Sequence, residues 1–374
     1  MSTTSAAPAT TVAVRLTGLA RTDTGRVDTG RTGTGSGRTG TGSGRTDTGS
    51  GGRDTAPGRL DVVPVAAPEP GPGEVLVRVT AVGLCGTDLA VRSGARPVPE
   101  LPWTVGHEGG GRVVAVGAGV DPGRVGEVVV VEPNLACGRC RFCVAGRTSA
   151  CPDRRSLGVN APGLLAGLVA VPAGYAHALP AGLDPATAER VVACVEPWVV
   201  TRAALRRAAP EPGSRCLVVG AGSQGTLLCL TLLAAGHVPV VAEPHDGRRR
   251  RAVDLDAEEL VPGEVFGTVF ETSGAPAAWP TAVAAVDRAG TLLLIGQHDG
   301  ESPVNTHDLV QRQVTVTGSL IYDHPGDFAG ALADLPAVAD ALVGLMEPEP
   351  FAPDRAAAAF DAVATADRKV WLAP

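Results

Sequence analysis

The sequence predicts an α/β protein of two domains, in which a β-rich domain precedes a doubly wound parallel sheet. Its 374 residues exceed the length at which one hydrophobic core usually keeps growing. The segment from Glu74 to Gly83 alternates apolar and polar residues, as a half-buried strand does. From Val199 to about Tyr322 the pattern becomes a helix followed by alternating strand and helix units, which is typical of a parallel sheet.

Composition favours a globular protein that acts on small molecules. Hydrophobic residues make up 44% of the chain and charged residues 19%, and the formal net charge of -7 gives no reason to expect nucleic acid or an anionic membrane as partner. No secretory signal is visible at the start, so we expect a cytoplasmic protein. The most apolar stretch, Cys216 to Ala242, is interrupted by a glycine-rich turn, which argues against a membrane span.

Residues 21–53 form an imperfect repeat of Thr, Gly, Arg and Asp with almost no apolar side chains. Such a segment cannot offset the entropy lost on ordering. We expect a disordered insertion between two strands, VAVRL before it and RLDVVPV after it. The alternative is that its arginines bind an acidic partner.

Four cysteines in residues 134–152 predict a closed metal site. Their spacing is C-x2-C-x2-C-x7-C, and in a reducing compartment such thiols are metal ligands more often than disulfides. Four thiolates match a structural zinc ion, which stabilises a lobe that lacks a core of its own. Iron–sulfur clusters use similar runs, but a β-rich domain favours zinc. The predicted ligands are Cys137, Cys140, Cys143 and Cys151.

A second, open metal site is predicted from residues that lie apart in the sequence. Cys85 occurs in GLCGTDL, His107 and Glu108 in GHEGGG, and Glu196 in CVEPW. One thiolate, one imidazole and one carboxylate leave a fourth position for water or substrate. Singly each residue is weak evidence, because a buried Cys or His usually packs and Glu196, followed by Pro197, could stand at a helix start.

A glycine-rich turn predicts a dinucleotide site. The pattern GAGSQG follows the strand RCLVV and opens a helix, where backbone amides can approach a pyrophosphate. Glu243 ends the next strand and can accept hydrogen bonds from the ribose of NAD. His245 and the arginines 248–251 could instead accommodate the phosphate of NADP, or form a solvated helix face; we expect NAD, because a carboxylate would repel that phosphate. The predicted contacts are Gly220, Gly222, Ser223, Gln224, Gly225, Glu243 and Arg248.

These motifs occur in the order found in the zinc-containing medium-chain alcohol dehydrogenases, which the chain resembles from about Glu74 to Tyr322. The EP motif at Glu196 and the segment NTHDLVQRQVTVTGSLIYDHPGDF resemble the sorbitol, threonine and 2,3-butanediol dehydrogenase branch. The resemblance implies a GroES-like catalytic domain in residues 1–198 and a Rossmann cofactor domain in residues 199–325. It also implies that residues 326–374 return to the catalytic domain, and that the protein is a homo-oligomer, dimer or tetramer.

By the same resemblance, Cys85, His107 and either Glu196 or Glu108 bind the catalytic zinc. Zinc lowers the pKa of a bound alcohol and stabilises the alkoxide from which a hydride passes to NAD or NADP. Thr87 matches the hydroxyl that passes the proton on. The substrate would be a secondary alcohol, diol or polyol. Alternatives are a carbonyl reductase or cyclitol or sugar dehydrogenase of secondary metabolism, and a catalytically weak nucleotide-binding relative.

The sequence also departs from this family. Only about two dozen residues separate Glu243 from the strand TVFETSG, which predicts that one helix of the cofactor domain is missing. The phrase GRVGEVVVVEP replaces the usual GDRV. Asp88 is expected to orient its loop, and His298 and His307 are interpreted as loop residues.

Overall fold

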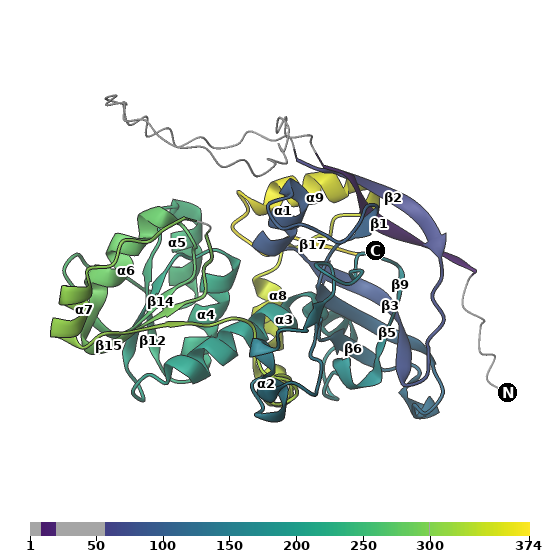
Figure 1. Ribbon diagram of the computed structural model, residues 1–374, viewed down its shortest axis with the longest axis horizontal. Helices are drawn as coiled ribbons and strands as arrows, with labels where there is room; N and C mark the ends of the chain where they lie inside the picture. The colour runs from purple at the N-terminus through teal and green to yellow at the C-terminus, as the bar shows by residue number, and fades with distance from the viewer. Residues whose placement is uncertain (1–8, 20–56, 299) are drawn as a thin grey trace, which may run out of the picture.

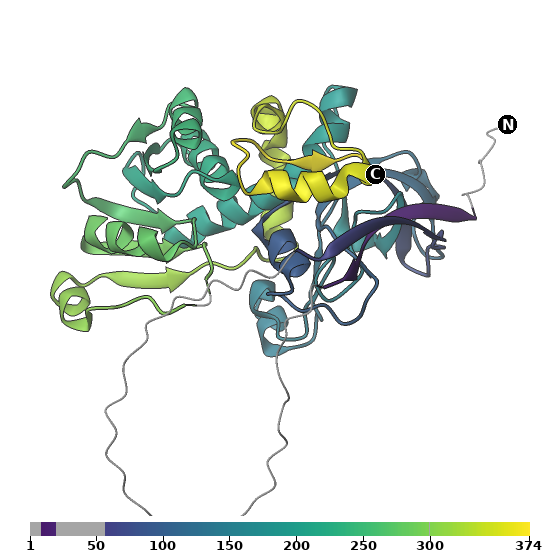
Figure 2. The ribbon, with the colours of Figure 1, turned by 90° about the horizontal axis from the view of Figure 1, so that it is seen from above.

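The computed structural model describes residues 9–19, 57–298 and 300–374. The prediction of a disordered insertion at residues 21–53 therefore falls outside the described residues. The described chain forms two lobes side by side, with helices α3 and α8 between them (Figure 1; Figure 2 shows the same arrangement from above).

The first lobe is a GroES-like arrangement of antiparallel strands. Three strands pair in the order β2-β1-β4, and a second sheet runs β10-β6-β5-β3-β17, with β9 also paired to β3. The predicted half-buried strand is β3, but only Arg78 on it is exposed, because α3 packs across this sheet as well. The strands are β1 (Thr10–Gly18), β2 (Arg59–Ala66), β3 (Glu74–Gly83), β4 (Trp103–Thr104), β5 (Glu108–Val116), β6 (Val128–Val131), β9 (Leu168–Pro172), β10 (Ala176–Ala178) and β17 (Trp371–Leu372).

The second lobe is a parallel Rossmann sheet. Its order is β13-β12-β11-β14-β15-β16, so the strand order reverses between β11 and β14, where such sheets bind dinucleotides. The strands are β11 (Arg215–Val219), β12 (Val238–Ala242), β13 (Glu258–Glu259), β14 (Phe266–Glu271), β15 (Val286–Leu294) and β16 (Thr315–Gly318). The accompanying helices are α4 (Ser223–Ala234), α5 (Asp246–Asp254), α6 (Trp279–Ala285) and α7 (Thr306–Arg312).

The helix predicted to be missing is the crossover between β13 and β14. Residues 260–265 join these strands without a helix, and Val261 and Val265 are 58% and 52% exposed there. The sequence interpretation of His307 as a loop residue is wrong, because it lies in α7, whose start is capped by the Asn305 side chain. His298 does lie in a loop.

Helix α3 (Pro185–Ala208) contacts both lobes. It packs on β3, β5 and β6 of the first lobe, on α4 of the second and on α8 (Gly326–Gly344). The sequence placed its start near Val199, whereas the helix begins fourteen residues earlier at Pro185, with Asp184 as its cap. The possibility that Glu196 stands at a helix start is therefore wrong, since it lies in the helix interior.

The remaining elements are short or close the chain. After α8, helix α9 (Ala356–Val363) lies on the β-rich lobe and β17 pairs with β3, so the tail returns to that lobe. The other elements are α1 (Gly86–Ser93), α2 (Arg141–Val144), β7 (Asn134–Leu135) and β8 (Arg155–Ser156). Within the described ranges, no helix combines the length and the apolar character that crossing a membrane requires.

Candidate active site

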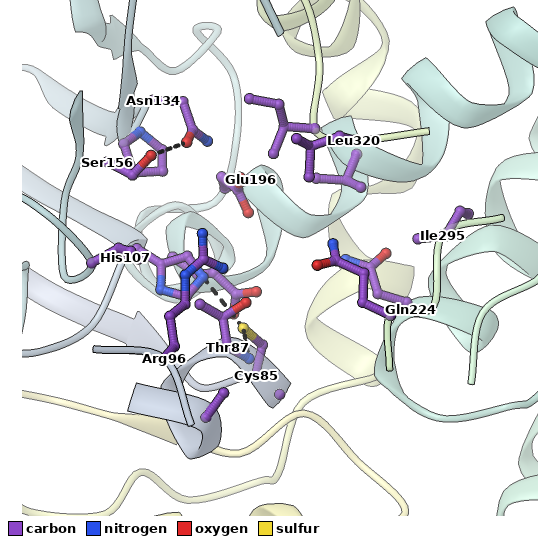
Figure 3. Close-up of a pocket in the computed structure, with 18 of the residues that line it drawn as sticks. Cys85, Thr87, Arg96, His107, Asn134, Ser156, Glu196, Gln224, Ile295 and Leu320 are labelled. Atoms are coloured by element: carbon purple, nitrogen blue, oxygen red, sulfur yellow. Dashed lines mark hydrogen bonds between the residues drawn. The ribbon is translucent and has the colours of Figure 1, made fainter. Parts of the chain in front are cut away.

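A cavity of about 600 Å³ between the lobes gathers residues from both. Cys85, Thr87 and His107 come from the β-rich lobe, and Gln224 of the glycine-rich turn faces them from the Rossmann lobe (Figure 3). Glu196 enters from α3 and points toward the Cys85 and His107 side chains. Of the predicted dinucleotide contacts, only Gln224 lines this cavity. A second cavity, which Cys85 and Gln224 also line, takes in Gly220, Gly222, Ser223, Glu243 and Arg248.

Local hydrogen bonds at the start of α1 fix Cys85 and His107. Cys85 is the N-cap residue, and its Sγ accepts a hydrogen bond from the Thr87 backbone at 3.3 Å. Asp88 Oδ2 accepts one from the Cys85 backbone at 3.0 Å, and its Oδ1 lies 3.2 Å from His107 Nδ1. The other imidazole nitrogen, Nε2, lies 3.3 Å from Cys85 Sγ. Asp88 therefore orients both side chains and leaves Nε2 and Sγ directed at one point.

The groups around that point suit a divalent cation. Burial raises the pKa of the Cys85 thiol, and the charge of Glu108 raises it further. Burial and Glu108 also raise the pKa of Glu196, to about 7. A cation among these groups would favour their ionised forms. The ligand atoms of Cys85, Asp88 and His107 lie within 4.8 Å of one another, and Glu196 stands outside this close set but faces the same cavity.

Glu108 has a partner that the sequence analysis missed. Its carboxylate forms an ion pair with Lys369, and both side chains are buried. Burial lowers the pKa of Lys369, but Glu108 outweighs this and holds the pKa above its ordinary value. Lys369 is the only lysine in the sequence, which otherwise uses arginine for its long basic side chains. That difference could have marked Lys369 as a residue with a particular role. The charge of Glu108 is thus balanced by Lys369.

Glu196 is supported by a chain of polar groups from the β-rich lobe. It faces the hydroxyl of buried Tyr322, which accepts a hydrogen bond from Asn134 Nδ2 at 2.9 Å. Ser156 in turn donates to Asn134 Oδ1 at 2.8 Å (Figure 3). Sequence reasoning did not find this chain, because its members are distant in the sequence and carry no motif.

Two arginines on the wall of the cavity were also missed. Arg154 donates to the Ser149 carbonyl at 2.6 Å, whereas Arg96 forms no ion pair or side-chain hydrogen bond with the described residues. Burial lowers the pKa of Arg154, and the charge of Arg96 lowers it further. Figure 3 shows Arg96 directed into the cavity beside Thr87 and His107. The wall next to the candidate metal site is therefore positively charged.

The four predicted structural cysteines come together in one lobe. Sγ of Cys143 lies 3.5 Å from that of Cys140 and 3.9 Å from that of Cys137, and the Cys137 backbone donates to Cys151 Sγ. Thiolates about 2.3 Å from one tetrahedral zinc ion lie about 3.8 Å apart, so the spacing fits zinc. Backbone hydrogen bonds from residues 139 and 140 lower the pKa of Cys137 to about 6, which favours a thiolate ligand.

Each glycine of the predicted dinucleotide turn has a different environment. Gly220 has a φ of +93°, which favours glycine. A Cβ on Gly225 would lie 1.9 Å from the Gly220 carbonyl oxygen, so this position lets α4 pack on the turn. A Cβ on Gly222 would meet no atom within 4 Å and would project toward the second cavity, which Gly222 lines. Ser223 and Gln224 line that cavity as well.

The end of β12 presents a carboxylate to the same turn. Glu243 Oε2 accepts a hydrogen bond from the Ala221 backbone at 2.7 Å, and Oε1 accepts one from the His245 backbone at 2.8 Å. Arg248 lines the second cavity but donates to the Ala364 carbonyl at 2.8 Å. Arg249 pairs with Asp246 at 2.6 Å. Two of the arginines considered for NADP are thus engaged within the protein.

Comparisons with known proteins agree with this arrangement. Residues 71–181 match the family model of the alcohol dehydrogenase GroES-like domain, and residues 224–336 match that of zinc-binding dehydrogenases. A 2-dehydro-3-deoxy-L-galactonate 5-dehydrogenase of Pseudoalteromonas atlantica is 31% identical over 70% of this chain and 80% of its own. An L-threonine 3-dehydrogenase of Pyrococcus abyssi is 33% identical over 67% and 76%. A solved structure of a cobalt- and zinc-bound alcohol dehydrogenase from Pyrobaculum aerophilum, 25% identical, superposes with a TM-score of 0.74 over 84% of this chain and 95% of that one.

Proposed function

Because the chain belongs to the zinc-dependent alcohol dehydrogenase family, we propose that it oxidises a secondary hydroxyl group of a polyol that carries a carboxylate, with NAD as hydride acceptor. It is an oxidoreductase, and its cofactors are zinc and a nicotinamide dinucleotide. The observation that carries the choice of substrate is Arg96, an unpaired cation among the described residues that line the cavity. The two relatives above support it, since galactonate and threonine each combine a hydroxyl with a carboxylate.

The residues of the cavity would divide the chemistry as follows. Cys85 and His107, with Glu196, would hold zinc, which when bound supplies a Lewis acid that makes the substrate hydroxyl more acidic. Thr87 lies two residues after Cys85 on the cavity wall and would receive the hydroxyl proton. Asp88 would keep His107 in the orientation needed for binding through Nε2. Arg96 would hold the substrate carboxylate and so determine which hydroxyl is presented.

The contacts of Glu243 and of the neighbouring arginines favour NAD over NADP. Its two oxygens each accept one backbone hydrogen bond and keep a further acceptor site for a ribose hydroxyl. A 2′-phosphate at this position would be repelled by the carboxylate. Arg248 donates to the Ala364 carbonyl and Arg249 pairs with Asp246, so neither guanidinium is free to bind such a phosphate.

The test of the substrate class compares charged and neutral polyols. NAD reduction would be measured with sugar acids, sugar alcohol phosphates and uncharged sugar alcohols, for the wild type and for Arg96→Ala and Arg96→Lys. A charge-assisted hydrogen bond contributes roughly 1.5–3 kcal/mol, so Arg96→Ala should lower kcat/KM for the preferred sugar acid about 10- to 100-fold. Arg96→Lys should restore part of this loss, and Arg250→Ala, at an exposed position, serves as control. Preference for neutral polyols with no effect of Arg96→Ala would refute the assignment.

Cytoplasmic residence and a homo-oligomeric state belong to the same proposal. The eight cysteines are free thiols, which suits a reducing compartment. Val316 is exposed on β16, the edge strand of the Rossmann sheet, and Val304 and Val310 are exposed just before α7 and within it. An exposed apolar edge strand favours pairing with a second copy. Size-exclusion chromatography with light scattering would determine the number of subunits.

A further inference from the structure

A third group of metal-ligating side chains lies outside both sites described above. Glu132 follows β6, His177 lies on β10, and His324 stands just before α8. His177 Nε2 and His324 Nδ1 each lie 2.8 Å from the same carboxylate oxygen, Glu132 Oε2. The three ligand atoms lie within 4.8 Å of one another.

Hydrogen bonds within this group do not satisfy Glu132. Its side chain is fully buried, and its second oxygen, Oε1, has no hydrogen-bond partner among the described residues. A buried carboxylate oxygen without a partner is costly, by roughly 1–3 kcal/mol or more. Both imidazoles instead converge on the other oxygen. This arrangement offers an ion two nitrogens and a carboxylate with an unused oxygen.

The imidazole rings are held in place before any ion binds. The Tyr175 ring stacks on His324 with centroids 4.2 Å apart, and the Phe328 ring stacks on His177 at 4.8 Å. Ligands fixed in this way lose little entropy on binding. The His177 and His324 side chains are 16% and 23% exposed, so an ion and its remaining water ligands can reach them.

We propose that Glu132, His177 and His324 form a third metal site, which binds a divalent transition metal such as Zn²⁺ or Co²⁺. Two imidazoles and one carboxylate are a ligand set that these ions favour. Ligand atoms about 2.1 Å from one ion lie about 3.0 Å apart at right angles and about 3.4 Å apart at tetrahedral angles, so the 2.8 Å separations found here are closer to a right-angled arrangement. Binding through both oxygens of Glu132 would also give Oε1 a partner.

An ion at this position would link the start of α8, through His324, to strands β6 and β10 of the β-rich sheet, through Glu132 and His177. The four-cysteine lobe contacts the same segment. The His324 backbone donates to Thr148 Oγ1 at 2.7 Å, and the Ser149 backbone donates to Asp323 Oδ1 at 2.9 Å. Both contacts join the cysteine lobe to the segment that returns from the Rossmann sheet. The role of the site is therefore structural, and it stabilises the junction of the two lobes.

Metal content of the full-length enzyme tests the proposal. The protein would be equilibrated with excess Zn²⁺, passed through a desalting column and analysed by mass spectrometry for zinc per chain. We expect three equivalents for the wild type and for the exposed control His307→Ala, and two for His177→Ala and His324→Ala. Glu132→Gln keeps the side-chain volume and one acceptor oxygen but removes the negative charge, and should weaken binding of the third ion at least tenfold in a calorimetric titration.

Cobalt distinguishes the sites without relying on the variants. Because the other two sites contain thiolates, Co²⁺ there gives sulfur-to-metal charge-transfer bands in the near ultraviolet. A third equivalent of Co²⁺ should add visible absorption without adding to those bands. Saturation at two equivalents in the wild type would overturn the proposal, as would a third equivalent retained in well-folded His177→Ala and His324→Ala proteins.

Discussion

Two glycines of the dinucleotide turn, Gly222 and Gly225, should respond to alanine in opposite ways. In Gly225→Ala the new Cβ would lie 1.9 Å from the Gly220 carbonyl oxygen, whereas ordinary contacts begin near 3.4 Å. The turn and the start of α4 must therefore separate by more than an ångström. In Gly222→Ala the Cβ meets no atom within 4 Å, and it would stand at the wall of the second cavity, where the predicted dinucleotide contacts gather.

The magnitudes follow from these two geometries. Overpacking costs about 1–3 kcal/mol, and each kcal/mol lowers the Tm of a domain of this size by roughly 2–4 °C. Gly225→Ala should therefore lower the Tm of the enzyme without cofactor by roughly 2–12 °C. Gly222→Ala should leave that Tm within about 1 °C of wild type, but it should raise the Kd for NADH tenfold or more, a loss of about 1.4 kcal/mol.

Differential scanning calorimetry and fluorescence titration with NADH provide the two measurements. The variants serve as controls for each other, because they introduce the same methyl group at two positions of one turn, one crowded and one open. If Gly222→Ala binds NADH like the wild type, the pyrophosphate does not approach this backbone. If Gly225→Ala is as stable as the wild type, the packing of α4 against Gly220 is looser than described.

The other predictions concern the metal sites, the ribose contact and the buried ion pair. Cys85→Ser should abolish turnover and remove one zinc per chain with little change in Tm, whereas Cys140→Ser should also lower the Tm; an active Cys85 variant would contradict the catalytic assignment. Glu243→Ala should raise the KM for NAD about tenfold or more and shift the ratio of kcat/KM toward NADP, and an unchanged ratio would mean that Glu243 does not contact the ribose. Lys369→Met should destabilise the protein by roughly 3–5 kcal/mol in urea unfolding, because it leaves Glu108 charged and buried. The double variant with Glu108→Gln should recover most of that loss, and failure to do so would show that packing rather than charge is decisive.

Features encoded by contiguous residues could be predicted from the sequence. The bounds of β3 were found because alternation is a local signal, and the four cysteines and the glycine-rich turn were found because their chemistry depends on short spacings. The signals for the start of α3 are also local, since Asp184 is a capping residue and Pro185 follows it. Pro197 nevertheless favoured a later start for this helix. A proline is expected near a helix start more often than in its interior.

Contacts between distant segments could not be predicted. The Asn134 and Tyr322 side chains that support Glu196 lie 188 residues apart, and Glu132 and His324 lie 192 apart. No periodicity or spacing relates such pairs, because their proximity follows from how the tail returns across the β-rich sheet. Our proposal that Glu196 rather than Glu108 binds zinc rests on one such contact, the ion pair between Glu108 and Lys369.

One proline and one glycine bring the candidate metal ligands to the same cavity. Pro197 has no N–H, so the Ala193 carbonyl cannot receive the usual helical hydrogen bond from it. Gly83 packs against this carbonyl so closely that a Cβ would lie 2.4 Å from the oxygen. Because Gly83 ends β3 two residues before Cys85, this approach draws the start of α1 toward the helix turn that carries Glu196. Pro197 therefore belongs to the packing that brings the Cys85 and Glu196 side chains to one cavity.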